Sequence, residues 1–242
     1  MVEFLYMKDS YLKEFDAIVT EIRNDTVILD KTAFFPAGGG VPCDTGCLVR
    51  NGTRSDVTEV AKRDGQIIHT VQNNGIKLGD AVTGFINWER RYVLMRNHTA
   101  AHLLASIFYN ELNVLITGNQ LGVDQSRMDF SMENFDRSLI EKVFQKANEE
   151  IHKNHVVKSY FMKREDALKI PGIIKLAAAG TQGNDLAHFP NTPELRIVEI
   201  ESIDIQLDGG CHVKSLKEIG KIEFMKAENK GKNNRRIYYT IN

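Results

Sequence analysis

Two histidines lie one helical turn apart in the segment RNHTAAHLL, at His98 and His102, and this spacing most constrains the fold. Residues four positions apart project from the same face of a helix, so one metal ion can contact both imidazoles. A tetrahedral zinc ion needs two further donors. The later segment DGGCH offers a carboxylate at Asp208 and a third imidazole at His212. The sequence therefore predicts a metal site built from two distant segments.

The alternative interpretation of an isolated histidine pair is a buried helix whose imidazoles bond backbone carbonyls. Apolar residues surround the pair at helical spacing, including Leu94, Ala101, Ala105, Phe108 and Leu112. The imidazoles therefore lie on or beside an apolar stripe, where a polar ring needs a partner. A metal ion is such a partner.

The fold class expected is α+β, with a small N-terminal β-barrel-like domain followed by an antiparallel-sheet α+β domain. Residues 1–89 contain short apolar runs separated by turn sequences such as Arg23-Asn-Asp and Asn73-Asn-Gly, a pattern typical of a small antiparallel barrel. Residues 90–242 form the second expected domain, which begins with the histidine helix.

Within residues 90–242 the pattern alternates between helices and strands. An amphipathic helix is expected over residues 135–154, with its buried stripe at Leu139, Val143, Ala147 and Ile151. Extended segments are expected over residues 114–130 and 195–200, and two closing strands over residues 219–224 and 236–241.

Composition excludes several classes of protein. The chain has 31 Lys and Arg against 32 Asp and Glu, so any polyanion must be met by a local basic patch. No stretch approaches the ~18 apolar residues of a membrane span, and the N-terminus lacks the apolar core of a signal peptide. Three cysteines form no secreted-domain framework, so we expect a cytoplasmic protein without membrane attachment.

Basic residues gather in two places in the sequence. One group lies near the C-terminus and the other flanks the histidine helix: Lys226, Lys230, Lys232, Arg235 and Arg236, and Arg90, Arg91 and Arg96. Such groups suit the phosphates of an RNA stem, and the alternative is an ordinary solvated face.

In this order along the chain, six segments resemble the free-standing alanyl-tRNA editing proteins of the AlaX type, relatives of the editing domain of alanyl-tRNA synthetase. The segments are FFPAGGGVPCDTG at residues 34–46, the helix from Arg90 through HTAAHLL, ITGNQ at 116–120, RMDF at 127–130, DGGCHV at 208–213 and KEIG at 217–220. They span nearly the whole chain, which makes the resemblance far more specific than any single motif.

The resemblance implies a zinc-dependent aminoacyl-tRNA deacylase. The implied substrate is alanine tRNA mischarged with serine or glycine, and Zn²⁺ would be held by the histidines at 98, 102 and 212 with Asp208. Thr117 matches the threonine that recognises the serine hydroxyl in this family, although a threonine also simply suits a strand. Substrate binding is expected at Arg96, Gln120 and the three glycines Gly38, Gly39 and Gly40. A tight turn is the alternative role of those glycines.

Two departures from the family pattern affect this interpretation. The family commonly has cysteine four residues before the final histidine, where this chain has Asp208, and a cysteine stands at Cys211 instead. Adjacent extended residues point to opposite faces, so Asp208 is the preferred fourth ligand and Cys211 the alternative. Ala37 and Val41 also stand where the family usually has Glu and Gln.

Two other functions compete with the deacylase. One is a tRNA-binding module with a purely structural zinc, because four protein donors describe a structural site. The other is an unrelated metallohydrolase, although Thr99 stands where HExxH peptidases carry their glutamate base. We expect a monomer or weak oligomer.

Overall fold

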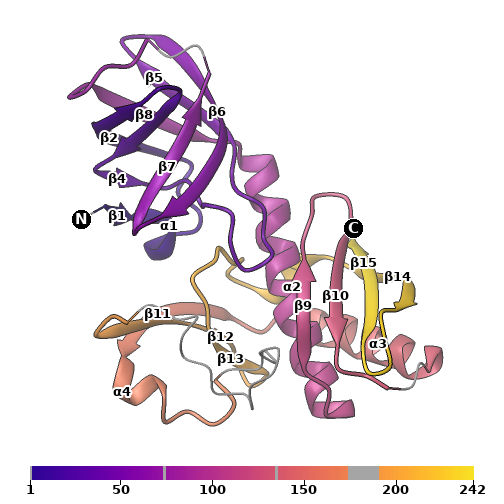
Figure 1. Cartoon of the computed structure of the whole chain (residues 1–242). Coiled ribbons are helices and arrows are strands. Elements are labelled where there is room, and N and C mark those ends of the chain that lie inside the picture. Colours follow the sequence, from indigo (N-terminus) through magenta and orange to yellow (C-terminus); the bar gives the residue numbers. More distant parts are fainter. Residues whose placement is uncertain (1, 73–74, 134–135, 174–190) are drawn as a thin grey trace. The chain divides into compact units, whose positions relative to one another are not determined.

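The computed structural model describes residues 2–72, 75–133, 136–173 and 191–242 (Figure 1). The chain divides into two compact units, Met1–Leu94 and Met95–Asn242. The division falls inside helix α2 (Trp88–Leu112), which begins in the first unit and ends in the second. The domain boundary expected between residues 89 and 90 stays a prediction.

The first unit is built around a closed antiparallel barrel whose strands follow the order β2-β3-β7-β6-β5-β8. These strands are β2 (Glu14–Arg23), β3 (Thr26–Leu29), β5 (Gly46–Arg50), β6 (Thr53–Arg63), β7 (Gln66–Val71) and β8 (Ala81–Ile86). Side chains alternate between the two faces of each strand, so every second residue points inward. The interior is filled by branched apolar residues such as Val19, Leu29, Leu48, Val60 and Ile67.

Three short elements lie outside the barrel in the part of this unit that the structure describes. Strand β1 (Glu3–Phe4) pairs in parallel with β4 (Lys31–Thr32), and helix α1 (Leu5–Lys8) follows β1.

The start of helix α2 is anchored by a buried ion pair. The Arg91 side chain is 1% exposed, and its Nε lies 2.9 and 3.0 Å from the two carboxylate oxygens of Asp44. Arg91 also donates to the carbonyls of Ser10 and Ala33, while Arg90 donates to the carbonyl of Cys43. The expectation that Arg91 meets phosphates is therefore wrong, because its guanidinium is buried and bound by its own chain.

The described part of the second unit contains two antiparallel sheets with helices packed on them. The four-stranded sheet has the order β14-β15-β10-β9, and the three-stranded sheet has the order β11-β12-β13. Their strands are β9 (Ile116–Gln120), β10 (Ser126–Phe130), β14 (Ile222–Asn229), β15 (Arg235–Ile241), β11 (Val157–Lys163), β12 (Glu194–Ile200) and β13 (Asp204–Leu207). The other helices among the described residues of this unit are α3 (Arg137–Lys153), α4 (Arg164–Ala167) and the 3-10 helix η2 (Leu216–Ile219).

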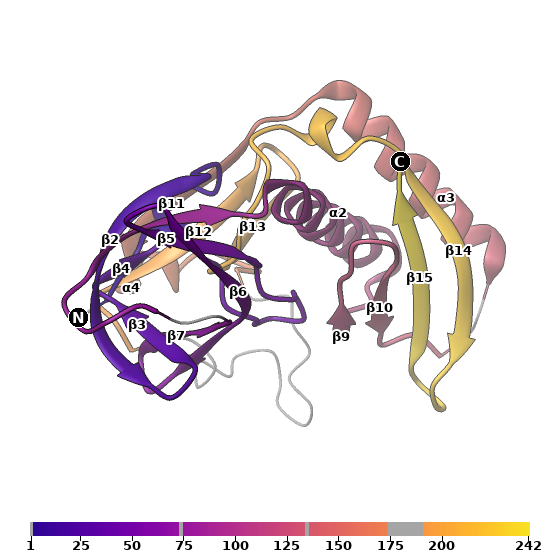
Figure 2. The same ribbon diagram turned by 90° about the horizontal axis from the view of Figure 1, so that it is seen from above.

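Aromatic contacts fix helices α2 and α3 to the four-stranded sheet. Phe108 of α2 lies 4.2 Å from Phe130 of β10 between ring centroids, and Phe144 of α3 lies 5.5 Å from Phe224 of β14. Figure 2 shows α3 running beside β14 and β15. The buried side of α3 and the later part of α2 are thus packed on the sheet.

The buried stripe of α3 differs from the expected one at its first position. Ile140, Val143, Phe144, Ala147 and Ile151 are buried, whereas Leu139 is 40% exposed. Each residue advances about 100° around a helix, so Leu139 lies about 80° from Ala147, while Ile140 lies only about 20° away. The helix begins at an Asp136 cap whose carboxylate accepts from the backbone of Ser138 and Leu139.

The expected fold class is confirmed: an antiparallel barrel near the N-terminus precedes an α+β unit with antiparallel sheets. Among the described residues, no helix has the length and apolar character needed to cross a membrane.

Candidate metal centre

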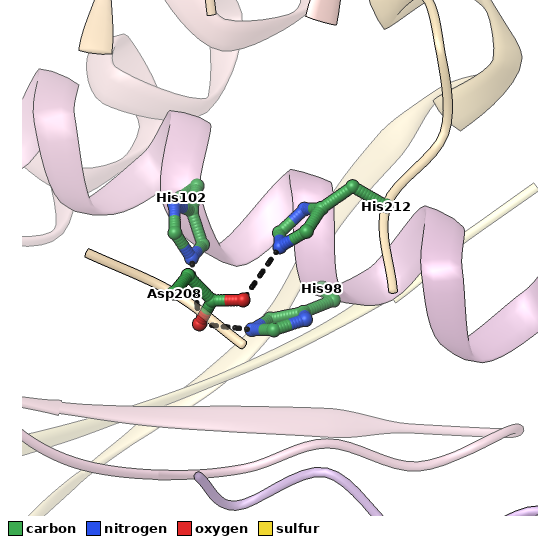
Figure 3. Close-up of side chains that lie close together, drawn as sticks. All are labelled: His98, His102, Asp208 and His212. Carbon is green, nitrogen blue, oxygen red and sulfur yellow. Dashed lines mark hydrogen bonds and ion pairs between the residues drawn. The ribbon is translucent and has the colours of Figure 1, made fainter. Parts of the chain in front are cut away.

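Four side chains from two distant segments converge in the second unit (Figure 3). His98 and His102 project from helix α2, and Asp208 and His212 come from the loop that follows strand β13. One ligand atom from each residue lies within 4.8 Å of the others. The geometry thus brings together the three imidazoles and the carboxylate that the sequence predicts.

The Nε2 atoms of all three imidazoles face the carboxylate of Asp208. Its oxygens lie 3.5 Å from His98 Nε2, 3.8 Å from His102 Nε2 and 3.1 Å from His212 Nε2. Donors about 2.0–2.1 Å from a tetrahedral zinc ion lie about 3.3 Å from one another. The observed spacings bracket that value, and three imidazole nitrogens with one carboxylate oxygen form a donor set that zinc accepts. The residues present therefore fit the ion.

Burial and neighbouring charges prepare most of this group to bind a cation. Burial lowers the pKa of His98 to about 4, and burial together with His98 holds the pKa of His212 well below its ordinary value. Burial also favours a protonated Asp208, but its interactions with His98 and with the other two imidazoles outweigh burial and lower the pKa of that carboxyl. At neutral pH these three side chains are already in the deprotonated form that a metal requires.

His102 is the exception in this group. Burial acts to lower its pKa, but the nearby carboxylates of Asp204 and Asp208 outweigh burial and raise the pKa to about 9. Without an ion, His102 therefore carries the proton that balances part of the carboxylate charge.

Two residues outside the donor group, Asp204 and Thr99, orient two of the imidazoles. Asp204 Oδ2, on β13, lies 3.4 Å from His102 Nδ1, and the hydroxyl of Thr99 lies 3.1 Å from His212 Nδ1. Thr99 donates its own proton to the carbonyl of Met95, so its oxygen accepts from His212. Such partners fix the tautomer that leaves Nε2 free to bind metal.

The loop that carries Asp208 is shaped by a buried arginine and a glycine. Arg196 of β12 donates from Nη1 to the carbonyls of Asp208 and Gly210, at 3.0 and 2.9 Å. The Gly210 amide donates to Asp208 Oδ1 at 2.6 Å. A Cβ at Gly210 would lie 2.4 Å from Cε1 of His98, so only glycine leaves room for that imidazole.

The sequence interpretation missed four of these residues: Asp204, Arg196, Thr99 as a partner of His212, and Gly210 as a packing requirement. Gly210 belongs to the DGGCH motif, which signals that the loop is unusual. Asp204 and Arg196 carry no local signal, because their roles depend on strand pairing between β12 and β13.

Comparison with known proteins agrees with the order of these segments. Residues 5–90 match the family described as tRNA synthetases class II (A), and residues 195–238 match the Threonyl and Alanyl tRNA synthetase second additional domain. The chain is 49% identical to the alanyl-tRNA editing protein AlaX-M of Saccharolobus solfataricus, over 100% of this chain and 99% of the relative. The chain belongs to the AlaX-M family of alanyl-tRNA editing proteins.

A second AlaX-M protein matches over nearly its full length, and an alanine–tRNA ligase matches over part of its length. The AlaX-M protein of Methanosarcina barkeri is 44% identical over 100% of this chain and 99% of its own. The alanine–tRNA ligase of Pyrococcus furiosus is 36% identical over 93% of this chain, which corresponds to 24% of the ligase. The resemblance stated from the sequence is thereby confirmed.

In this AlaX-M family member, the sulfur of Cys211 lies outside the donor group. Cys211 is buried and is not in a disulfide, and the group formed by the described residues comprises three histidines and Asp208. The geometry thus favours Asp208 over Cys211 as the fourth donor.

The residues expected to bind substrate have contacts within their own units. Thr117 lies exposed on β9 and donates from Oγ1 to Asn234 Oδ1 at 3.0 Å. Gln120 accepts from Arg127, and Arg96 donates to the carbonyls of Ile219 and Asn242. Their roles toward a substrate stay predictions.

The three glycines of the first unit form an exposed turn. The backbones of Gly38 and Val41 pair with each other, and Gly39 and Gly40 have φ of 60° and 81°. Positive φ favours glycine, so the turn itself explains two of the three residues. Contact of this turn with RNA stays a prediction.

The basic residues near the C-terminus largely pair with acidic neighbours. Lys226 and Lys230 both contact Glu228, and Arg236 lies 2.7 Å from Asp129. Arg235 is buried. Much of this positive charge is thus balanced locally, which weakens the interpretation of the hairpin as a bare phosphate-binding patch.

Proposed function

We propose that this chain is a trans-editing hydrolase that removes serine or glycine from mischarged alanine tRNA in the cytoplasm, at a zinc site formed by His98, His102, Asp208 and His212. The observation that carries this proposal is the buried group of three imidazoles and one carboxylate in a chain of the AlaX-M family. The reaction would hydrolyse the ester that joins the amino acid to the terminal adenosine.

Physical chemistry explains why such an enzyme is needed. A synthetase pocket shaped for alanine cannot strongly reject another small side chain, because one small group changes binding by only about 1–3 kcal/mol. A second site that contacts the serine hydroxyl selects in the opposite direction. We assign that contact to Thr117, an exposed residue of β9.

Zinc held by the four donors would act as a Lewis acid and a template for the ester carbonyl or the attacking water. The chain's own residues prepare the site. Asp204 orients His102 through Nδ1, and Thr99 does the same for His212. Because the Thr99 oxygen already accepts from His212, this side chain cannot replace the glutamate base of HExxH peptidases.

The experiment that tests this function compares alanine tRNA charged with serine, glycine or alanine. Selective release of serine or glycine, lost after chelation and restored by added Zn²⁺, would support the proposal, provided that circular dichroism shows a folded protein throughout. Full activity of the folded, metal-free protein would refute the catalytic role of zinc.

The four-donor set also favours one competing function, because closed tetrahedral sites are usually structural. In that case the protein would bind alanine tRNA without releasing any amino acid. Indifference to tRNA would instead point to an unrelated metallohydrolase.

A further inference from the structure

The hydroxyl of Thr117 is paired with a side chain from the opposite end of the second unit's sequence. Thr117 Oγ1 donates to Asn234 Oδ1 at 3.0 Å. We propose that Asn234 is a positioning residue that orients the Thr117 hydroxyl toward the serine side chain of the mischarged tRNA. This inference rests on the proposed editing function and deepens it.

An irregularity in the sheet brings the two residues together. Strands β9 and β15 are not neighbours, because β10 lies between them. The β9–β10 register shifts between Asp129 and Phe130, so that Phe130 pairs with Ile116 and Asp129 pairs with Gly118. Thr117 is therefore the extra residue of a bulge, and bulges redirect side chains at sheet edges and beside active sites.

Asn234 reaches Thr117 from the turn that joins β14 to β15. It directly precedes Arg235, which pairs with Phe130 on the other side of β10. Phe130 of β10 pairs with Ile116 on one side and with Arg235 on the other. Thr117 follows Ile116 in the sequence and Asn234 precedes Arg235, so both lie next to this row of paired residues. The contact between Asn234 and Thr117 spans the end of β10.

The turn that carries Asn234 is held firmly. Buried Arg235 donates from Nη1 to Asn229 Oδ1 and to the carbonyls of Gly231 and Asn234, at 3.0, 2.7 and 3.0 Å. The amide of Lys230 also donates to the Asn234 carbonyl at 3.0 Å. With its backbone fixed at these points, the Asn234 carboxamide presents an oxygen at a defined place.

The direction of this hydrogen bond determines what Thr117 can recognise. Thr117 gives its only hydroxyl proton to Asn234, so its remaining capacity is to accept a hydrogen bond. The hydroxyl of a serine ester can donate such a bond. The methyl group of alanine and the hydrogen of glycine cannot. Asn234 thereby makes Thr117 an acceptor that distinguishes serine from the other two amino acids.

The test measures kcat/KM for seryl- and glycyl-alanine tRNA with the zinc-loaded full-length protein. Asn234→Ala should lower the serine-to-glycine ratio by about 3- to 10-fold, the range expected when one neutral hydrogen bond is lost. Asn234→Asp retains an acceptor oxygen and should keep the ratio near that of the wild type. Asn233→Ala changes the preceding exposed residue of the same turn and serves as the matched control.

A double-mutant cycle with Thr117→Val separates positioning from a purely structural role. If Asn234 acts through Thr117, then Asn234→Ala should change the ratio little further in the Thr117→Val background. The inference would be overturned if Thr117→Val lowers the serine-to-glycine ratio of kcat/KM but Asn234→Ala leaves it unchanged. That result would leave the proposed function intact. A wild type that releases neither amino acid would overturn the editing function itself. Melting temperatures of all variants identify any that fail to fold.

Discussion

Replacing Gly210 by alanine should remove the metal site while leaving the fold intact. The added Cβ would lie 2.4 Å from Cε1 and 2.6 Å from Nδ1 of His98, and 3.0 Å from Asp208 Oδ1. Ordinary contacts begin near 3.4 Å, so the His98 ring must move by about 1 Å. Metal–ligand distances tolerate only about 0.2 Å, so this movement takes His98 out of the donor set.

The expected magnitude follows from the energy of a structural zinc site. Four ligands together supply about 10–16 kcal/mol, so one ligand corresponds to about 2.5–4 kcal/mol. Zinc affinity should therefore fall by roughly 10²- to 10³-fold. The folded protein should lose only about 1–3 kcal/mol in free energy of unfolding, because the ring adjusts within an otherwise packed core.

Zinc affinity is measured by competition with a chromophoric chelator, and stability of the metal-free protein by urea unfolding. Gly75→Ala is a suitable control, because a Cβ there meets nothing within 4 Å and the backbone needs no positive φ. A Gly210→Ala protein that binds zinc as tightly as the wild type would refute the assignment of His98 as a ligand.

Three further outcomes are expected. Because the pKa of His102 is raised to about 9, zinc binding near pH 7.5 should release about one proton, and zinc affinity should rise with pH until about pH 9. Calorimetry in buffers of different ionisation enthalpy measures this proton release, and finding none would contradict the prediction. Cys211→Ser should keep one zinc per chain by elemental analysis, whereas Asp208→Ala should lose it, and the reverse result would make the thiol the ligand. Arg91→Ala should lower the free energy of unfolding by about 3–5 kcal/mol, because it leaves the Asp44 carboxylate buried without its ion-pair partner. A decrease below about 1 kcal/mol, measured by urea unfolding, would show that this ion pair is not important for stability.

The elements of the fold could be predicted where the sequence period is clear. Strands of the barrel alternate along short apolar runs, and the histidine helix, expected to begin near residue 90, begins at Trp88. The predicted buried stripe of α3 was wrong at Leu139. Positions four residues apart do not stay on one face, because a helix has 3.6 residues per turn. Periodicity identifies the helix more reliably than it identifies the residues at the edge of its buried face.

The site was predictable only in part, for a related reason. The spacing of His98 and His102 is a local property of one helix, and so is the short loop from Asp208 to His212. By contrast, the partners that orient these side chains come from pairing and packing that no local pattern encodes. Asp204 reaches His102 because β13 pairs with β12, and a buried arginine shapes the loop from the neighbouring strand.

The two halves of the donor group are separated by more than 100 residues along the chain. A ribosome-bound chain that stops before Asp208 offers only the two imidazoles of helix α2, too few to retain an ion. Metal loading must therefore wait until the chain has been synthesised as far as His212. Once loaded at a hundred times the dissociation constant, the ion would add about 2.7 kcal/mol to the stability of the finished protein.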